Sequence, residues 1–476
     1  MVYYTGPELK IPMHIIYALI YAICFVIEIE ILSNPNKKLK YQPYMYGNRI
    51  PLILMAILII QTIINQKYLI SFCFTILPMI SIYYALMVLI SPTLRTHVQE
   101  RSMLILWLMP SFLILYPYLQ SSSKPLFYFH IPQNLIVWIL CIWVAGFIAV
   151  LLYTSLQHIH VRKKILKDCI VVNDERVLQI WKQECSYTNK EKIEFQLVVS
   201  NAAFSPLTIG MYDKYTYVVL PHTNYSDQEL HLIFRHEILH ICRKDIGTKF
   251  YIAFCNALCW YNPFMWFAMR KCSEDIELSC DKAVLEQENN EMRNVYANVI
   301  LNNAQSEIGY TSCLSTKATS LRYRLKNIVQ HKSKATASFL VGICFVVLIL
   351  SSATYTITYG EYNGMDVVYN TSDITKFDVA SFRKGTFGID NNTYNIEILN
   401  KYLEDATFHD IGKNVVLSDI DDTYRIHLES ENLDIYIYFS ENIIGVLRYN
   451  DDNSVKYYYT KEKIDITKLR EAMTIQ

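Results

Sequence analysis

His236, Glu237 and His240 form a His-Glu-x-x-His sequence, which brings two metal-ligating side chains and a carboxylate together. On a helix, residues four apart share one face, so both imidazoles can reach the same ion. Zinc binds imidazole nitrogens at about 2.0–2.1 Å and, in catalytic sites, keeps one position for water. Glu237 is then placed to take a proton from that water. The sequence predicts a zinc peptidase site with His236 and His240 as ligands and Glu237 as the catalytic base. The plainer alternative is a polar helix face.

The residues before this motif are suited to start the helix that it needs. Ser226 is a candidate N-cap, and Glu229 stands three residues later, as in a capping box. We therefore expect a helix that begins at Ser226 and continues through His240.

A third ligand is expected from the acidic residues of a second helix, 270–285. The candidates are Glu274, Asp275, Glu277 and Asp281. Glu277 and Asp281 lie four residues apart and share a face, whereas Glu274 lies almost a turn from Glu277. A carboxylate ligand beside a carboxylate that orients a ligand histidine is a common pairing at zinc sites. We assign Glu277 to zinc and Asp281 to the orientation of a histidine. The alternative is a solvated acidic helix face.

The segment 250–269, between the two helices, is apolar and aromatic, with Asn262 and Pro263 in its middle. Both of its ends must stay on one side of a membrane if the flanking helices share one zinc ion. We therefore interpret it as re-entrant or interfacial, where aromatic residues are favoured. The alternative is a buried helical hairpin.

Long apolar runs indicate a membrane protein. The chain is 52% hydrophobic with a formal net charge of zero, so charge suggests no nucleic-acid binding. A spanning helix needs about 20 apolar residues. Six runs approach that length, with residues 65–67 expected to form a turn between the second and third: 11–32, 50–66, 68–91, 103–120, 133–156 and 337–357.

The loop charges set an orientation for these spans. Lys and Arg gather between the first and second spans, after the third and fifth spans, and before the last span. The positive-inside rule then places the N-terminus outside, residues 157–336 in the cytoplasm and the C-terminal tail outside. The predicted organisation is a membrane domain (1–156), a cytoplasmic peptidase domain (157–336), a last transmembrane helix (337–357) and an extracytoplasmic domain (358–476).

The tail, 358–476, contains short stretches in which apolar and polar residues alternate. This pattern predicts strands at 414–417, 424–428, 433–439, 443–449 and 455–459, with helices at 394–406 and 466–473. We expect a small α+β domain that serves as a sensor for an extracytoplasmic ligand, which the sequence does not identify.

Three segments together resemble the membrane-bound antirepressor metallopeptidases of the BlaR/MecR type: 236–245 (HEILHICRKD), 260–266 (WYNPFMW) and 277–281 (ELSCD). The match also includes residues 205–210 and 218–221, and the latter segment resembles the family's edge strand beside the active-site helix. The resemblance covers roughly residues 1–357. It implies a gluzincin-like cytoplasmic peptidase, with zinc on His236, His240 and Glu277 and with Glu237 catalytic.

The tail departs from the best-known members of that family, which end in a penicillin-binding sensor with a Ser-x-x-Lys nucleophile. Ser381 and Lys384 have that spacing, but the tail is too short for the fold, and no Lys-Thr-Gly follows. The glycines after Ser381 favour a turn over a helix interior. We expect no acylation by a β-lactam and a different sensor domain.

The sequence therefore indicates a multi-pass α-helical membrane protein with a cytoplasmic zinc peptidase domain and a small α+β extracytoplasmic domain. The leading hypothesis is a signalling protease, embedded in the lipid bilayer, that cleaves itself or a cytoplasmic repressor. The repressor as a substrate is implied only by the resemblance to the BlaR/MecR-type family. One alternative is a housekeeping protease for membrane proteins. Another is a receptor with a vestigial site. A homodimer is left open.

Overall fold

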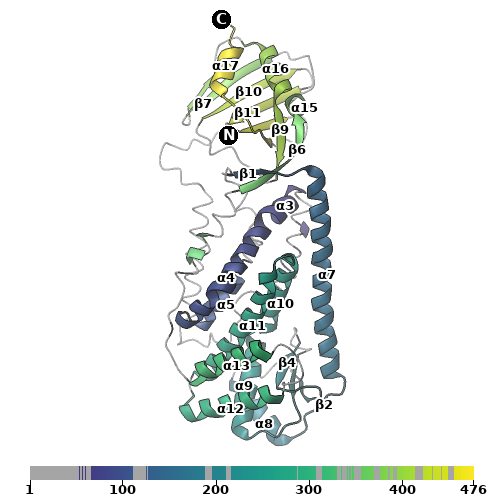
Figure 1. The fold of residues 1–476 in the computed structure, drawn as a ribbon, viewed down its shortest axis with the longest axis vertical. Helices are drawn as coiled ribbons and strands as arrows, with labels where there is room; N and C mark the ends of the chain where they lie inside the picture. Colours follow the sequence, from purple (N-terminus) through teal and green to yellow (C-terminus); the bar gives the residue numbers. More distant parts are fainter. Residues whose placement is uncertain are drawn as a thin grey trace.

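The computed structural model of the chain is long and narrow, with a large sheet at one end and a helical assembly at the other (Figure 1). Apart from isolated positions in 53–60, at 125, at 334 and in 340–347, the structure describes residues 66–110, 127–187, 196–210, 216–286, 288–306, 314–329, 355–368, 376–383, 386–389, 394–412, 422–430, 433–440, 442–448 and 455–475.

One candidate membrane span is a nearly straight succession of helices. It consists of α3 (Gln66–Ser71), the π-helical turn η3 (Phe72–Ile76) and α4 (Leu77–His97). Residues 69–97 have a mean hydropathy of 2.2 over their most apolar window, of which 44% is buried. The expected turn at 65–67 is wrong for Gln66 and Lys67, because both are already helical.

Helix α7 (Gln133–Leu166) is the second candidate span and runs along the side of the molecule (Figure 1). Its 34 residues give a length of about 51 Å, more than a hydrocarbon core of about 30 Å requires. Only 6% of its most apolar window is buried, and its hydropathy there is 2.9. Large hydrophobic side chains stay exposed along it: Leu135, Val137, Trp138, Ile142, Val144, Ile148, Leu152, Tyr153, Leu156, Ile159 and Val161. Exposing this much apolar surface to water costs free energy, whereas lipid covers it without that cost.

The remaining expected spans fall mostly outside the described residues. Segment 11–32 lies wholly outside them, and segment 50–66 has a few isolated positions and Gln66 within them. Segment 103–120 is described only at residues 103–110, most of which belong to helix α5 (Glu100–Leu108), which is buried except at Arg101. The expected span 337–357 extends too far at its C-terminal end, because strand β6 (Tyr355–Asn363) already begins at Tyr355.

Segment 250–269 forms the turn of a helical hairpin. Helix α10 (Asp245–Leu258) and helix α11 (Pro263–Val284) meet at residues 259–262, and Asn262 caps α11 by accepting a hydrogen bond from the Phe264 amide. The hairpin packs into one apolar core with α4, α5 and Phe147 of α7. A helical hairpin was the alternative to the re-entrant or interfacial arrangement. Its tip contacts α4, where Asn262 donates to the Ser81 carbonyl oxygen, and α7, where Trp260 donates to the Trp143 carbonyl oxygen.

The helical end also contains a four-stranded sheet in the order β2-β3-β5-β4. Strands β3 and β5 are parallel, and β2 and β4 pair antiparallel at the two edges. The bounds are β2 (Ile170–Val171), β3 (Gln196–Val199), β4 (Leu207–Ile209) and β5 (Tyr217–Leu220). The helices beside it are α8 (Glu175–Tyr187), α9 (Asp227–Arg243), α12 (Asn290–Ser306) and α13 (Leu314–Val329).

The opposite end is a nine-stranded sheet in the order β1-β6-β9-β13-β12-β11-β10-β7-β8. Eight strands come from the tail: β6, β7 (Lys376–Arg383), β8 (Thr386–Ile389), β9 (Thr407–Ile411), β10 (Asp422–Ser430), β11 (Leu433–Ser440), β12 (Ile443–Arg448) and β13 (Val455–Tyr459). Helices α15 (Gly364–Val368), α16 (Ile396–Asp405) and α17 (Ile466–Met473) accompany them. The expected strands from 424 on and both expected helices are confirmed, while 414–417 lies outside the described residues.

Strand β1 (Phe127–His130) was not expected from the sequence. It precedes α7 directly and pairs in parallel with β6, from Phe127 opposite Tyr355 to His130 opposite Thr358. The segment directly before α7 therefore contributes an edge strand to the sheet of the tail.

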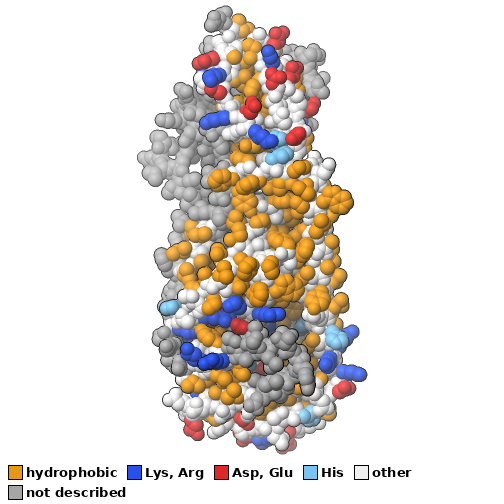
Figure 2. Space-filling model, viewed as in Figure 1, with side chains coloured by type: hydrophobic (Ala, Val, Ile, Leu, Met, Phe, Trp, Pro, Cys, Tyr) orange, Lys and Arg blue, Asp and Glu red, His pale blue; other side chains and the backbone are white. Residues whose placement is uncertain are grey.

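The surface is divided along the long axis. Figure 2 shows hydrophobic side chains gathered over the middle of the molecule, with basic side chains below them and charged side chains of both signs on the sheet above. The nine-stranded sheet and helix α9 thus lie beyond opposite ends of this apolar belt (Figures 1 and 2).

Candidate metal centre

Helix α9 begins as its sequence predicts. The Ser226 side chain accepts a hydrogen bond from the Glu229 amide, and the Glu229 carboxylate accepts one from the Ser226 amide at 2.8 Å, which completes a capping box. Phe234 and Ile238 pack into the core shared with the four-stranded sheet, while Leu232 and Leu239 pack toward α11 and α12. This packing fixes the rotation of the helix about its axis, and so the direction in which its histidines point.

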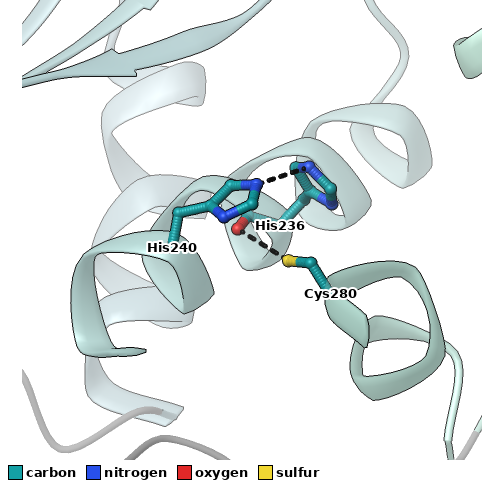
Figure 3. A group of neighbouring side chains, drawn as sticks. All are labelled: His236, His240 and Cys280. Atoms are coloured by element: carbon teal, nitrogen blue, oxygen red, sulfur yellow. Dashed lines mark hydrogen bonds between the residues drawn. The ribbon is translucent and has the colours of Figure 1, made fainter. Parts of the chain in front are cut away.

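His236 and His240 point into the same space, as Figure 3 shows. Their Nε2 atoms are 3.0 Å apart, and their rings are nearly perpendicular at 88°. Two nitrogens bound tetrahedrally to one zinc ion at about 2.05 Å would be separated by about 3.3 Å. The observed separation is close to that value.

Glu277, on α11, brings a carboxylate oxygen to the same point. Its Oε2 lies 3.4 Å from His236 Nε2 and 3.6 Å from His240 Nε2, so three ligand atoms form a nearly equilateral triangle. Burial opposes ionisation of this side chain, but the His240 imidazole and the Lys249 ammonium hold the pKa of the Glu277 carboxyl well below its usual value. An ionised carboxylate is the form that binds a metal.

Cys280 is a second candidate for the third ligand. Its thiol lies within 4.8 Å of ligand atoms of both histidines (Figure 3). It donates a weak hydrogen bond to the His236 carbonyl oxygen, with 3.5 Å between sulfur and oxygen. This bond uses the protonated thiol, whereas a metal ligand is a thiolate. Burial raises the pKa of the Cys280 thiol, but the two histidines bring it down to about 7. Its sulfur is nevertheless directed at the His236 carbonyl, whereas Glu277 Oε2 lies 3.4 and 3.6 Å from the two Nε2 atoms, so the distances favour Glu277.

The outer nitrogen of His240 is held by Asp245. Nδ1 of His240 lies 2.7 Å from a carboxylate oxygen of Asp245, which is 1% exposed. Lys244 makes this contact possible, because it adopts a left-handed backbone conformation with φ of 56°, ends α9 and turns the chain into α10. The carboxylate accepts the Nδ1 proton and leaves a lone pair on Nε2.

The outer nitrogen of His236 is held by Tyr296, on α12. The Tyr296 hydroxyl lies 2.7 Å from His236 Nδ1 and donates to Asp281 at 2.8 Å. Since that hydroxyl proton is directed to Asp281, Nδ1 of His236 is the donor in the other bond. Arg324, on α13, fixes Asp281 with two hydrogen bonds of 2.8 Å. Asp281 thus contacts His236 chiefly through Tyr296, and its own carboxylate is 3.7 Å from Nδ1 of His236.

The donor set fits a metal cation. In the tautomers that Asp245 and Tyr296 set, the two Nε2 atoms face each other across 3.0 Å, so without a metal one of them must hold a proton, and an ionised carboxylate lies beside them. Two facing lone pairs and a carboxylate repel one another unless a cation or proton lies between them. Two imidazoles and a carboxylate are also a common ligand set of catalytic zinc.

The other two acidic residues weighed as ligands have a different role. Glu274 and Asp275 both bind the guanidinium of Arg95, at the end of α4, at 2.9 and 2.7 Å. Trp107 of α5 donates to the second oxygen of Asp275 at 2.8 Å. These bonds connect the helix of Glu277 to the candidate membrane helices.

Glu237 lies at the edge of the four-stranded sheet. Its carboxylate accepts a hydrogen bond of 2.7 Å from the Thr208 hydroxyl of edge strand β4. Glu237 is 5% exposed, and its neighbours on both sides in the helix are the ligand histidine and a core isoleucine. The general base expected from the sequence therefore lies between the histidines and an edge strand.

Sequence reasoning did not assign roles to Asp245, Tyr296, Arg324 and Thr208. Asp245 stands five residues after His240, and only the unusual conformation of Lys244 brings it back. Tyr296 is 60 residues from His236 and is placed by packing of α12 on α9. Neither contact follows from helical periodicity.

Comparison with known proteins bears on the same region. A model of the BlaR1 peptidase M56 family matches residues 128–328, which include each residue described in this site from Thr208 to Arg324. The Regulatory protein BlaR1 of Bacillus licheniformis is 27% identical over 189 residues, amounting to 38% of this chain and 30% of that protein. The match thus spans less than a third of that relative's length. The family match ends before strand β6.

Proposed function

We propose that this chain, whose residues 128–328 match the BlaR1 peptidase M56 family, is a membrane-embedded zinc metallopeptidase acting in signal transduction. The observation that carries the proposal is the triangle of His236 Nε2, His240 Nε2 and Glu277 Oε2, with sides of 3.0, 3.4 and 3.6 Å. The regulatory relative supports a signalling role rather than general protein turnover.

In this proposal His236, His240 and Glu277 would hold a zinc ion, which when bound would supply Lewis acidity toward water and the scissile carbonyl. Asp245 and Tyr296 keep the two imidazoles in the tautomer that directs Nε2 to the ion. Arg324 and Asp281 support Tyr296 from behind. The positioning groups come from α10, α11, α12 and α13, so four helices fix the geometry of the site.

Glu237 acts as the general base in this proposal. Its carboxylate takes a proton from the attacking water and passes it to the leaving amine as the peptide bond breaks. The Thr208 hydroxyl, 2.7 Å away, holds the carboxylate in place. A positioned acid–base group of this kind contributes typically about 10²–10⁴-fold to the rate.

The substrate is proposed to bind as an extended peptide along β4. This strand is at the edge of its sheet and pairs with β5 on its other side, so its backbone is placed to accept an added strand. The Thr208 contact puts that edge next to Glu237. We propose a segment of this chain or a cytoplasmic repressor protein as the substrate.

The apolar belt supports a proposed topology in which the peptidase end is cytoplasmic and the nine-stranded sheet is extracytoplasmic. The two lie beyond opposite ends of the belt (Figure 2), and Lys163 and Lys164 lie near the peptidase end of α7. Basic residues on that side agree with the positive-inside rule. The tail sheet would then sense a ligand, as a small α+β domain joined to a multi-pass membrane domain.

Metal content and proteolysis of the purified full-length chain test the proposal. We expect about one zinc per chain at this site, lost in His236→Ala and retained in Glu237→Gln, which should be inactive because only the base is removed. Glu175→Gln, an exposed glutamate on α8, is the matched control. Self-cleavage is followed by mass spectrometry. Proteolysis that survives Glu237→Gln would contradict the proposal.

A second comparison decides the third ligand. Glu277→Gln should lose most of the zinc, whereas Cys280→Ala should keep it, because the thiol is engaged with the His236 carbonyl. The reverse result would assign the third position to Cys280.

A further inference from the structure

Three ligand-type side chains meet at the far end of the molecule from the zinc site. His130 ends β1, Glu361 lies on β6 and His409 lies on β9, and these three strands are neighbours in the nine-stranded sheet. One ligand atom from each lies within 4.8 Å of the other two. His130 Nε2 and Glu361 Oε1 are 4.0 Å apart, and the two imidazole rings are centred 4.6 Å apart.

A break in the strand pairing produces this arrangement. The register between β6 and β9 shifts between Tyr359 and Tyr362, as in a β-bulge. Gly360, within the bulge, has a φ of +68°, and a Cβ there would lie 2.8 Å from the Tyr362 ring, so glycine is required. Bulges re-aim side chains. Here the bulge brings the Gly360 carbonyl and the Glu361 side chain to the histidines.

His409 is held in the manner of a metal ligand. Its side chain is 2% exposed, and Nδ1 lies 2.6 Å from the Gly360 carbonyl oxygen. A carbonyl can only accept, so Nδ1 carries the proton and Nε2 keeps its lone pair. A backbone carbonyl that fixes the tautomer of a histidine is a frequent partner of metal-bound imidazole.

We propose that His130, Glu361 and His409 form a second metal site, specific for a divalent transition-metal ion and distinct from the peptidase centre. Two imidazoles and one carboxylate suit zinc, nickel, copper or cobalt and are poor for calcium or magnesium, which prefer oxygen ligands. Tetrahedral coordination would bring the ligand atoms to about 3.3 Å from one another. Glu361, whose side chain is 71% exposed, is free to close the remaining distance.

Metal binding at this site would fasten β1 to the rest of the sheet. The parallel pairing of β1 with β6 is short, and only Ile131 and Pro132 separate His130 from α7. A metal bridge from His130 to β6 and β9 would therefore fix the outer end of α7 to the tail. A role of this bridge in signalling rests on the proposed function, whereas the binding itself does not.

Cobalt titration of the full-length protein in detergent tests the site. The His236→Ala, His240→Ala double variant removes the first centre, so the result does not depend on whether the peptidase proposal holds. We expect one equivalent of Co²⁺ with visible absorption, displaced by Zn²⁺. His130→Asn and Glu361→Gln, both at partly exposed side chains, should each weaken binding about 10-fold or more.

His427→Asn is the matched control, because His427 lies on β10 of the same sheet and contacts Asp434 instead. It should leave Co²⁺ binding unchanged. If the double variant does not fold, wild-type protein loaded with one equivalent of Zn²⁺ serves as the starting point for the same titration. Binding that is absent, or equal in the His130→Asn and His427→Asn variants, would overturn the proposal.

Discussion

The two histidines of the proposed zinc site have outer partners of different strength, and this predicts a ranking of metal affinities. Asp245 offers His240 a buried carboxylate at 2.7 Å, whereas Tyr296 offers His236 a neutral hydroxyl at the same distance. We expect Asp245→Asn to weaken zinc binding about 10- to 100-fold, the range for loss of such a carboxylate partner. Tyr296→Phe removes a neutral bond of about 0.5–1.5 kcal/mol, which corresponds to about 2- to 12-fold.

The structure also indicates that Asp245→Asn leaves the fold intact. Asp245 Oδ1 has no hydrogen-bond partner among the described residues, so an amide nitrogen there breaks no other bond. The substituted side chain keeps its size and can still accept from His240 Nδ1 through its oxygen. The change therefore reports on the charge of the partner rather than on packing.

Zinc affinity is measured by competition with a chromophoric chelator, on full-length protein in detergent. Asp227→Asn and Tyr225→Phe are the matched controls: Asp227 lies in the first turn of α9 and pairs with Arg176, and Tyr225 bonds to Asn303. Neither should change the affinity. The reasoning fails if Tyr296→Phe costs more affinity than Asp245→Asn, or if Asp227→Asn costs as much.

Three further predictions follow from other contacts. Arg95→Met should destabilise the protein by about 3–5 kcal/mol, because it leaves Asp275 buried without a countercharge. Adding Asp275→Asn should restore much of the lost stability, as measured by thermal unfolding. Additive destabilisation by the two substitutions would contradict this. Cysteine labelling from either side of the membrane should place Lys163 and Tyr458 on opposite sides; labelling of both from one side would refute the proposed topology. A penicillin should form no covalent adduct with the protein, since Ser381 lies in strand β7 rather than on a helix, and a stoichiometric adduct in the intact mass would restore a β-lactam sensor.

Local pattern was sufficient where the controlling interactions are local. The capping box of Ser226 and Glu229 and the four-residue spacing of His236 and His240 depend only on helical geometry, and the structure shows both. Among the four acidic candidates on α11, the sequence also selected the one whose carboxylate faces the histidines. The positions of the four residues around the helix were sufficient to select Glu277, because the face of α11 that carries Glu277 is turned to α9.

The groups that the sequence did not place depend on packing between distant segments. Strand β1 pairs with β6 more than two hundred residues away, and a four-residue strand between two apolar runs gives little signal of its own. Tyr296 reaches His236 only because α12 packs beside α9. The bulge at Gly360 is visible in the sequence as a glycine, but its partner His409 becomes apparent only from the pairing of β6 with β9.

The ion pair of Arg95 with Asp275 bears on how the catalytic part can be produced. A soluble fragment starting at residue 157 would lack Arg95 and Trp107, which hold Asp275 two residues before Glu277. It would also uncover the face of the α10–α11 hairpin that packs on α4 and α5, including Tyr251, Phe254 and Met265. Such a fragment would expose this apolar surface and would leave Asp275 without its countercharge, so it should aggregate. Expression and inhibitor screening therefore call for the whole chain in a lipid or detergent environment.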